Sequence, residues 1–291
     1  MKLSANTNLL DKIFGPRATV DMFAAAGFDA LDFSQFRDEF YTDAHDKTFY
    51  TELRTYAESK GLYYNQAHAP FGSSFTDEAQ TEKRFEEITT AMRIASWLGV
   101  RNIIVHPCQH LTYAEEGVPE KLFEINMAFY RRLIPYCEEY GIRVAVENMW
   151  QHTGMINHST CSRASEFLRY MDALDDHFVA CLDIGHAVLV REDPDRMIRA
   201  LGGKYLKSLH VHDVDGVVDS HTLPFIGVTD WEAVMKALAE IDYQGEFTYE
   251  AGNFLLKTPD PLKQQALNYM GQVGKYLISR FDAYKAEFAA K

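Results

Sequence analysis

The sequence predicts a single α/β domain, a (β/α)8 TIM barrel that spans residues 1–291. The length of 291 residues is close to the roughly 250 that an eightfold barrel needs. Short β-rich apolar runs alternate with longer amphipathic stretches from end to end, which is typical of βαβ units in a parallel sheet. No low-complexity linker or change of composition marks a second domain.

Eight segments have the short, apolar, β-rich character expected of strands buried in a parallel barrel. In chain order they cover residues 2–6, 29–34, 63–69, 102–107, 143–148, 179–185, 206–212 and 246–251.

The segments between these strands have the periodicity of amphipathic helices. They cover residues 20–27, 46–61, 79–99, 120–141, 161–174, 194–202, 230–241 and the chain from Asp260 onward. Gly61, Gly99 and Gly141 each stand just before a predicted strand, where glycine commonly ends a helix. Thr229 or Asp230 is expected to cap the helix that begins at Trp231, whose ring we interpret as packing.

Charge and apolar content restrict the classes of partner. The chain carries 29 Lys and Arg against 42 Asp and Glu, a formal charge of -13, and the sequence contains no basic patch. Nucleic acid and anionic lipid surfaces are therefore disfavoured as partners. No apolar run is long enough to cross a membrane or serve in a secretion signal, which predicts a cytoplasmic protein. The sequence leaves open whether a homo-oligomer forms.

The four cysteines, Cys108, Cys137, Cys161 and Cys181, lack CxxC spacing. They are expected to be reduced, buried thiols rather than a disulfide framework or a zinc knuckle.

Histidines and carboxylates gather where the predicted strands end. Because the active site of such a barrel lies at the carboxyl ends of its strands, this position favours a catalytic or metal-binding role. Carboxylates that converge there need a cation to offset their repulsion. The residues at or just beyond strand ends are His68, His106, Glu147, Asp183, His186, His210, His221 and Glu250.

Glu147, Asp183, His210 and Glu250 combine three carboxylates with one imidazole. This oxygen-rich set suits a divalent metal such as manganese, magnesium, cobalt or zinc, and no organic cofactor is expected. His212 and His110 stand close to His210 and His106, so a shifted strand register would exchange them.

The segments VAVENM, ACLDIGHA, LHVHD with the following DSH, and TYEAGN resemble the xylose-isomerase-like TIM barrel superfamily over nearly the whole chain. That superfamily includes tagatose/psicose-type epimerases, hydroxypyruvate-type isomerases and the endonuclease IV type of nuclease. The resemblance to the sugar enzymes implies that Glu147, Asp183, His210 and Glu250 bind the metal. It also implies that Glu147 and Glu250 are acid and base, while His186 touches a substrate oxygen.

These roles predict a sugar isomerase or epimerase acting on a small sugar or polyol. One carboxylate removes a proton next to a carbonyl, the metal stabilises the enediolate, and the same or a second carboxylate returns the proton. The loops after the second and fifth strands, residues 35–43 and 150–158, lack a basic cluster and suit a neutral polyol. His68 and His106 are further candidates for substrate binding. The arginine that tagatose-type epimerases carry after the histidine of the seventh strand is missing, which leaves the substrate open.

The nuclease branch gives an alternative, a multi-zinc phosphodiesterase or abasic-site nuclease. In that interpretation His68, His106, His186, Asp219 and His221 are additional metal ligands. The acidic and neutral character of the loops favours the sugar enzyme instead. A lyase-type or non-catalytic role is a third interpretation, since a fold does not dictate its function.

Overall fold

The computed structural model describes residues 1–34 and 46–290. Eight parallel strands form one sheet in the order β10-β1-β2-β3-β4-β5-β8-β9. The strands are β1 Leu3–Asn6, β2 Ala30–Ser34, β3 Tyr63–His68, β4 Asn102–Ile104, β5 Arg143–Glu147, β8 Phe178–Asp183, β9 Leu206–His210 and β10 Phe247–Tyr249. All eight lie within or overlap the predicted segments, so the strand prediction is confirmed.

The sheet closes into a barrel between its two outer strands. The Val211 N–H donates to the Thr248 carbonyl at 2.9 Å, and the Glu250 N–H donates to the Val211 carbonyl at 3.0 Å. Val211 and Tyr249 form the parallel bridge that joins the two edges. This bridge joins the two outer strands of the eight-stranded sheet and brings the ends of β9 and β10 together.

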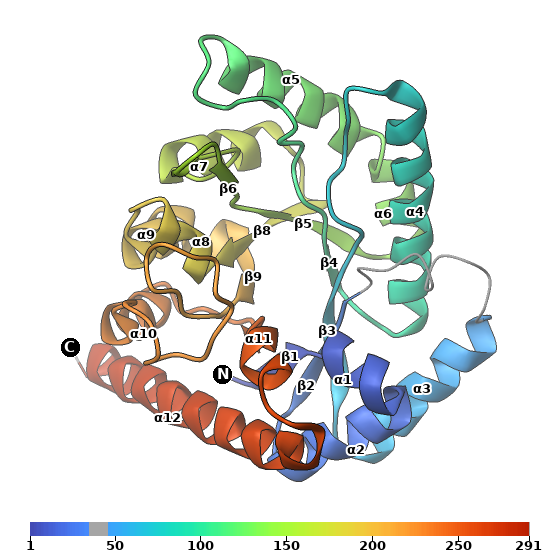
Figure 1. Cartoon of the computed structure of the whole chain (residues 1–291), viewed down its shortest axis with the longest axis vertical. Helices are drawn as coiled ribbons and strands as arrows, with labels where there is room; N and C mark the ends of the chain where they lie inside the picture. Colours follow the sequence, from blue (N-terminus) through green and yellow to red (C-terminus); the bar gives the residue numbers. More distant parts are fainter. Residues whose placement is uncertain (35–45, 291) are drawn as a thin grey trace.

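Helices surround the barrel (Figure 1). Their apolar faces pack on the outward side chains of the strands and form the main hydrophobic core. The helices are α1 Asn8–Phe14, α2 Pro16–Ala26, α3 Lys47–Ser59, α4 Glu78–Trp97, α5 Val118–Arg131, α6 Ile134–Tyr140, α7 Ala164–Ala173, α8 Ile184–Leu189, α9 Pro194–Tyr205, α10 Trp231–Glu240, α11 Gly252–Leu256, the 3-10 turn η2 Asp260–Leu262 and α12 Lys263–Ala289.

The fold differs from the prediction in several places. The short helices α1, α8 and α11 were not predicted, and α8 begins inside the segment 179–185 that was expected to be a strand. The helix expected over residues 120–141 is interrupted between α5 and α6, because Pro135 lacks an N–H and its ring clashes with the carbonyl of Arg131. The segment expected to be a loop after β5 contains an antiparallel hairpin, β6 Trp150–His152 and β7 Ile156–His158.

Alternation along each strand decides what faces the barrel axis. On β5, Val144 and Val146 belong to the outer core, whereas Ala145 belongs to a separate small cluster. That cluster consists of Ile104, Ala145, Val179 and Cys181. Glu147 and Arg143 share the inward side of β5 with Ala145, one at each end of the strand. All four cysteines are free and buried, which agrees with the prediction of reduced, buried thiols.

No helix among the described residues is both long and apolar enough to traverse a bilayer.

Candidate metal centre

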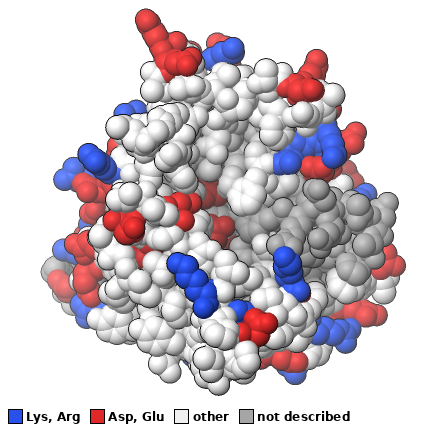
Figure 2. All heavy atoms as spheres, viewed as in Figure 1, with Lys and Arg blue, Asp and Glu red and all other residues white. Residues whose placement is uncertain are grey.

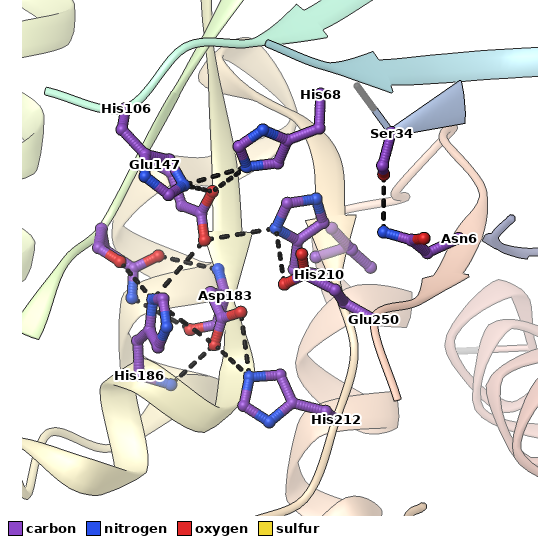
Figure 3. A network of polar contacts seen from close by, with 12 residues as sticks. Asn6, Ser34, His68, His106, Glu147, Asp183, His186, His210, His212 and Glu250 are labelled. Atoms are coloured by element: carbon purple, nitrogen blue, oxygen red, sulfur yellow. Dashed lines mark hydrogen bonds and ion pairs between the residues drawn. The ribbon is translucent and has the colours of Figure 1, made fainter. Parts of the chain in front are cut away.

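Four predicted ligands converge at the carboxyl end of the barrel. Glu147, Asp183, His210 and Glu250 each offer one ligand atom, and these atoms lie within 4.8 Å of one another. His210 stands between the two glutamates, with its Nδ1 at 3.2 Å from Glu147 Oε1 and 3.3 Å from Glu250 Oε2 (Figure 3). All four side chains are buried. The register pairs Asp183 of β8 with His210 of β9, and it pairs Glu147 of β5 with Cys181, the inward residue before Asp183.

The charges of this group are mutually dependent. Burial raises the pKa of the Glu147 carboxyl, but the neighbouring His210 and His106 outweigh burial and hold the pKa well below its usual range. Burial lowers the pKa of His210, whereas Glu250 and Glu147 raise it well above the usual value. Carboxylates this deep in a protein require a positive partner, and a protonated histidine or a metal ion can fill that role.

The arrangement fits a divalent metal. Glu147 Oε1 and both ring nitrogens of His210 are buried and make no hydrogen bond of good geometry with any described residue. Buried polar atoms without such a partner are costly, and coordination would satisfy them. The donor set of three carboxylates and one imidazole suits the metals predicted from the sequence.

A second group of possible ligands shares Glu147. His68 Nε2 lies 2.9 Å from His106 Nε2, and His106 Nε2 lies 3.1 Å from Glu147 Oε2. Burial lowers the pKa of His106, which favours the neutral, metal-binding form of its ring. His106 also lines the pocket at the barrel mouth, whereas His68 is fully buried beneath it.

A third group lies beside Asp183. Its possible ligands are His186, His212, Asp219 and His221. Asp219 Oδ2 lies 3.1 Å from His221 Nε2 and 3.6 Å from His186 Nε2. Burial opposes protonation of His186, but Asp183 and Asp219 raise its pKa to about 10, and Asp219 contributes to raising that of His221 to about 9. The structure thus brings all nine predicted site residues into three adjoining groups.

Backbone carbonyls orient three of these histidines. His68 Nδ1 donates to the Ala69 carbonyl at 2.6 Å, His186 Nδ1 to the Asn148 carbonyl at 2.9 Å, and His221 Nδ1 to the Glu250 carbonyl at 2.7 Å. A carbonyl only accepts, so each Nδ1 carries a proton and the neutral ring presents the Nε2 lone pair to the site. This arrangement is common among histidines that bind metals.

The sequence analysis did not predict that three further residues, His212, Asp32 and Asn148, lie beside the predicted ligands. His212 is additional to His210 rather than its replacement, and its Nε2 lies 3.0 Å from both oxygens of Asp183. Asp32 on β2 is fully buried with Oδ2 at 3.9 Å from His210 Nε2. Asn148 accepts from the Asp183 N–H at 2.7 Å and donates to the Asp183 carbonyl at 2.9 Å. The alternation of β2 and β9 could have indicated the inward Asp32 and His212.

His110 lies outside these groups. Its Nδ1 faces the Cys108 thiol and the Ser74 carbonyl. His106 lies two residues after the inward Ile104, so it occupies the inward position just beyond β4.

A pocket of about 440 Å³ opens above the centre. Its walls are aromatic and neutral polar side chains, among them Phe71, Gln109, Trp150 and Gln151, and its floor includes Glu147 and Glu250. No lysine or arginine lines this pocket among residues 1–34 and 46–290. Figure 2 shows atoms of Asp and Glu residues, in red, in the central hollow of this face.

The hairpin β6/β7 supplies part of this wall, including Trp150 and His152. The indole N–H of Trp150 donates to Asp219 Oδ2 at 3.3 Å, which links the hairpin to the third group. The predicted contribution of the loop Gln35–Asp43 lies outside the described residues.

Comparisons with known proteins agree with this fold. Residues 20–272 match the family described as the xylose isomerase-like TIM barrel, and the chain belongs to that family. This confirms the resemblance and the fold class predicted from the sequence.

Individual relatives are distant. An inosose dehydratase of Yersinia enterocolitica is 25% identical over 236 residues, which cover 70% of this chain and 74% of the relative. A solved D-tagatose 3-epimerase-like protein superposes with a TM-score of 0.77 at 20% identity, covering 99% of this chain and 100% of that one. An IOLI protein solved with a bound zinc atom superposes with a TM-score of 0.74 at 17% identity, covering 98% and 99%.

Proposed function

We propose that this protein is a divalent-metal-dependent isomerase or epimerase of a small sugar or polyol derivative. The observation that carries the proposal is the convergence of Glu147, Asp183, His210 and Glu250 beneath a pocket without basic residues among those the structure describes. The names of the relatives, which include a tagatose-epimerase-like protein and a zinc-bound IOLI protein, support the same class.

Glu147 and Glu250 are the proposed proton-transfer groups. Both line the pocket floor, and both lie within 3.3 Å of the same nitrogen of His210, so they can reach neighbouring atoms of one substrate. One carboxylate removes the proton from the carbon next to a carbonyl, which gives an enediolate. Return of the proton by the same group gives an isomer, and delivery by the other group gives an epimer. A bound divalent cation would stabilise negative charge on the substrate oxygens.

The pocket favours an uncharged substrate. His186 and His106 line its wall and can hydrogen-bond hydroxyl groups, while Phe71 and Trp150 offer apolar faces to a carbon chain or ring. A phosphate group would meet Glu147, Asp219 and Glu250 without a described lysine or arginine in the same pocket, which disfavours phosphorylated substrates.

Exchange of substrate protons with heavy water tests the mechanism. The metal-loaded protein is expected to incorporate deuterium into a ketose, and Glu147→Gln and Glu250→Gln are each expected to slow exchange by at least about 10²-fold. Glu120→Gln, an exposed glutamate paired with Arg169, is the matched control and should leave exchange unchanged. Wild-type rates of exchange in both glutamine variants would overturn the mechanism.

A multi-zinc phosphodiesterase, including an abasic-site nuclease, is the second candidate. The observation that favours it is the set of three adjoining ligand groups, which could hold more than one metal. Metal analysis of protein purified without chelator separates the two. One metal per chain with deuterium exchange supports the sugar enzyme, whereas three metals, no exchange and cleavage of abasic DNA support the phosphodiesterase. Product analysis by NMR distinguishes an isomer from the dehydrated product that the name of the Yersinia relative suggests.

A further inference from the structure

A second large cavity, of about 670 Å³, lies at the amino-terminal end of the barrel, opposite the metal centre. Five basic side chains line it: Lys2, Arg54, Arg101, Arg143 and Lys207. This corrects the prediction that the chain has no basic patch. The five residues are far apart in the sequence, and only barrel closure brings them together.

The carboxylates of this cavity are already engaged. Glu58 pairs with Arg54, whose Nε lies 2.8 Å from Glu58 Oε1. Glu246 accepts a hydrogen bond of 2.6 Å from the Tyr63 hydroxyl and one of 3.4 Å from Asn65 Nδ2. Glu58 is thus paired with Arg54, whereas Glu246 keeps its charge, so the five cations of the cavity outnumber its two carboxylates.

Among the described residues, Arg101 and Arg143 are the two arginines of this cavity that lack a paired carboxylate, as do Lys2, which lies over the Tyr63 ring, and Lys207, which donates to the Gly203 carbonyl. Neither guanidinium lies within 4.0 Å of an acidic group in the described part of the chain. Arg143 is half-buried, and its Nε donates to Asn102 Oδ1 at 3.1 Å, which leaves its terminal nitrogens available. Burial and the nearby charge of Arg101 both lower the pKa of Arg143. Two like charges in a partly desolvated cavity favour binding of an anion between them.

The position of Arg143 keeps this cavity separate from the metal centre. Arg143 and Glu147 are the first and last residues of β5, so they lie about 13 Å apart along the strand. The apolar cluster of Ile104, Ala145, Val179 and Cys181 fills the level between them. A ligand at the amino-terminal end cannot contact the substrate pocket directly.

We propose that this cavity binds a phosphate-bearing small molecule, with Arg101 and Arg143 as its principal ligands. Planar guanidinium groups bind phosphate oxygens in pairs, and Lys2 and Lys207 add positive charge around them. The volume lies in the range of small-molecule sites. A nucleic acid or a membrane is disfavoured, because the site is a cavity on a chain whose overall formal charge is -13.

Calorimetric titration of the metal-loaded protein with inorganic phosphate and with AMP tests this inference. At about 50 mM salt, where screening is weak, one or both are expected to bind the wild type. The double variant Arg101→Ala/Arg143→Ala is expected to bind at least about tenfold more weakly. The matched control Arg132→Ala/Arg196→Ala removes the same charge from exposed arginines paired with carboxylates and should bind like the wild type.

Absence of binding to the wild type would overturn the proposal. Equal binding to the double variant would also overturn it, because the ligand would then bind outside this cavity. Tighter binding of an octapeptide of glutamate than of AMP would overturn the ligand class. The single variant Arg101→Ala, whose side chain is exposed, tests the site if the double variant does not fold. None of these results depends on turnover, so they are independent of the proposed isomerase function.

Discussion

Asp213 organises the loop that carries Asp219 and His221, and its replacement by alanine should loosen that loop. The carboxylate is fully buried and accepts five hydrogen bonds. The donors are the Val214 N–H at 3.0 Å, the Phe225 N–H at 3.0 Å, the Thr229 N–H at 3.2 Å, the Thr229 hydroxyl at 2.7 Å and the indole N–H of Trp231 at 2.9 Å.

The cost of Asp213→Ala follows from which donors can reach water. Phe225 is exposed and Thr229 is partly exposed, so their groups can rehydrate. Val214 and Trp231 are buried, and their N–H groups would be left without a partner. Two such donors cost about 1–3 kcal/mol each, so we expect a loss of roughly 3 kcal/mol in the free energy of unfolding. For a chain of this size that loss lowers Tm by about 5 °C.

Calorimetric melting and metal analysis check this expectation. Asp213→Ala should also weaken metal retention by the group that contains Asp219 and His221. Asp215→Ala is the matched control, because Asp215 accepts two backbone N–H groups of the same loop but is exposed. The control should shift Tm by less than about 1 °C. If both variants melt at the same temperature, the assignment of Asp213 as the organiser of this loop is wrong.

Two further predictions concern the centre and the stability of the barrel. Gly185→Ala should place a Cβ 2.1 Å from His212 Cε1. Because His212 is fully buried, we expect the free energy of unfolding to fall by about 1–3 kcal/mol and His212 to move away from Asp183. An unchanged melting temperature and an unchanged crystal structure would contradict this prediction. Burial raises the pKa of Asp11 to about 6 despite its hydrogen bond from Thr7. The native state therefore binds this proton more tightly than the unfolded state, and the associated stability is complete below about pH 3.9 and lost as the pH rises through 6. Since Asp11 is only partly buried, Asp11→Asn should stabilise the protein by about 1 kcal/mol at pH 8 and by nothing measurable at pH 4. Urea unfolding at the two pH values measures the free energy of unfolding of the variant and the wild type. An equal gain in stability at both pH values would refute the raised pKa of Asp11.

The barrel and the positions of the site residues could be predicted because both depend on local pattern. Apolar β-rich runs alternate with amphipathic stretches, and parallel strands place their carboxyl ends at one edge, so Glu147, Asp183 and His210 could be expected to meet. The hairpin that contains Trp150 was missed, because its two strands are only three residues each and carry no strong alternation. Pro135 alone indicates an interrupted helix, but the helical periodicity on both sides of it favours one continuous helix, which is what the sequence predicted.

The sequence by itself determined the fold class, the strand ends and the chemical nature of the ligands, since these follow from residue type and short-range spacing. The tertiary structure alone decided the tautomers and the grouping. It placed the Ala69, Asn148 and Glu250 carbonyls against histidine Nδ1 atoms and added His212 to Asp183. It also assembled the basic cavity around Arg101 and Arg143 from separate strands. These features depend on distances between residues far apart in the chain, which no local pattern encodes.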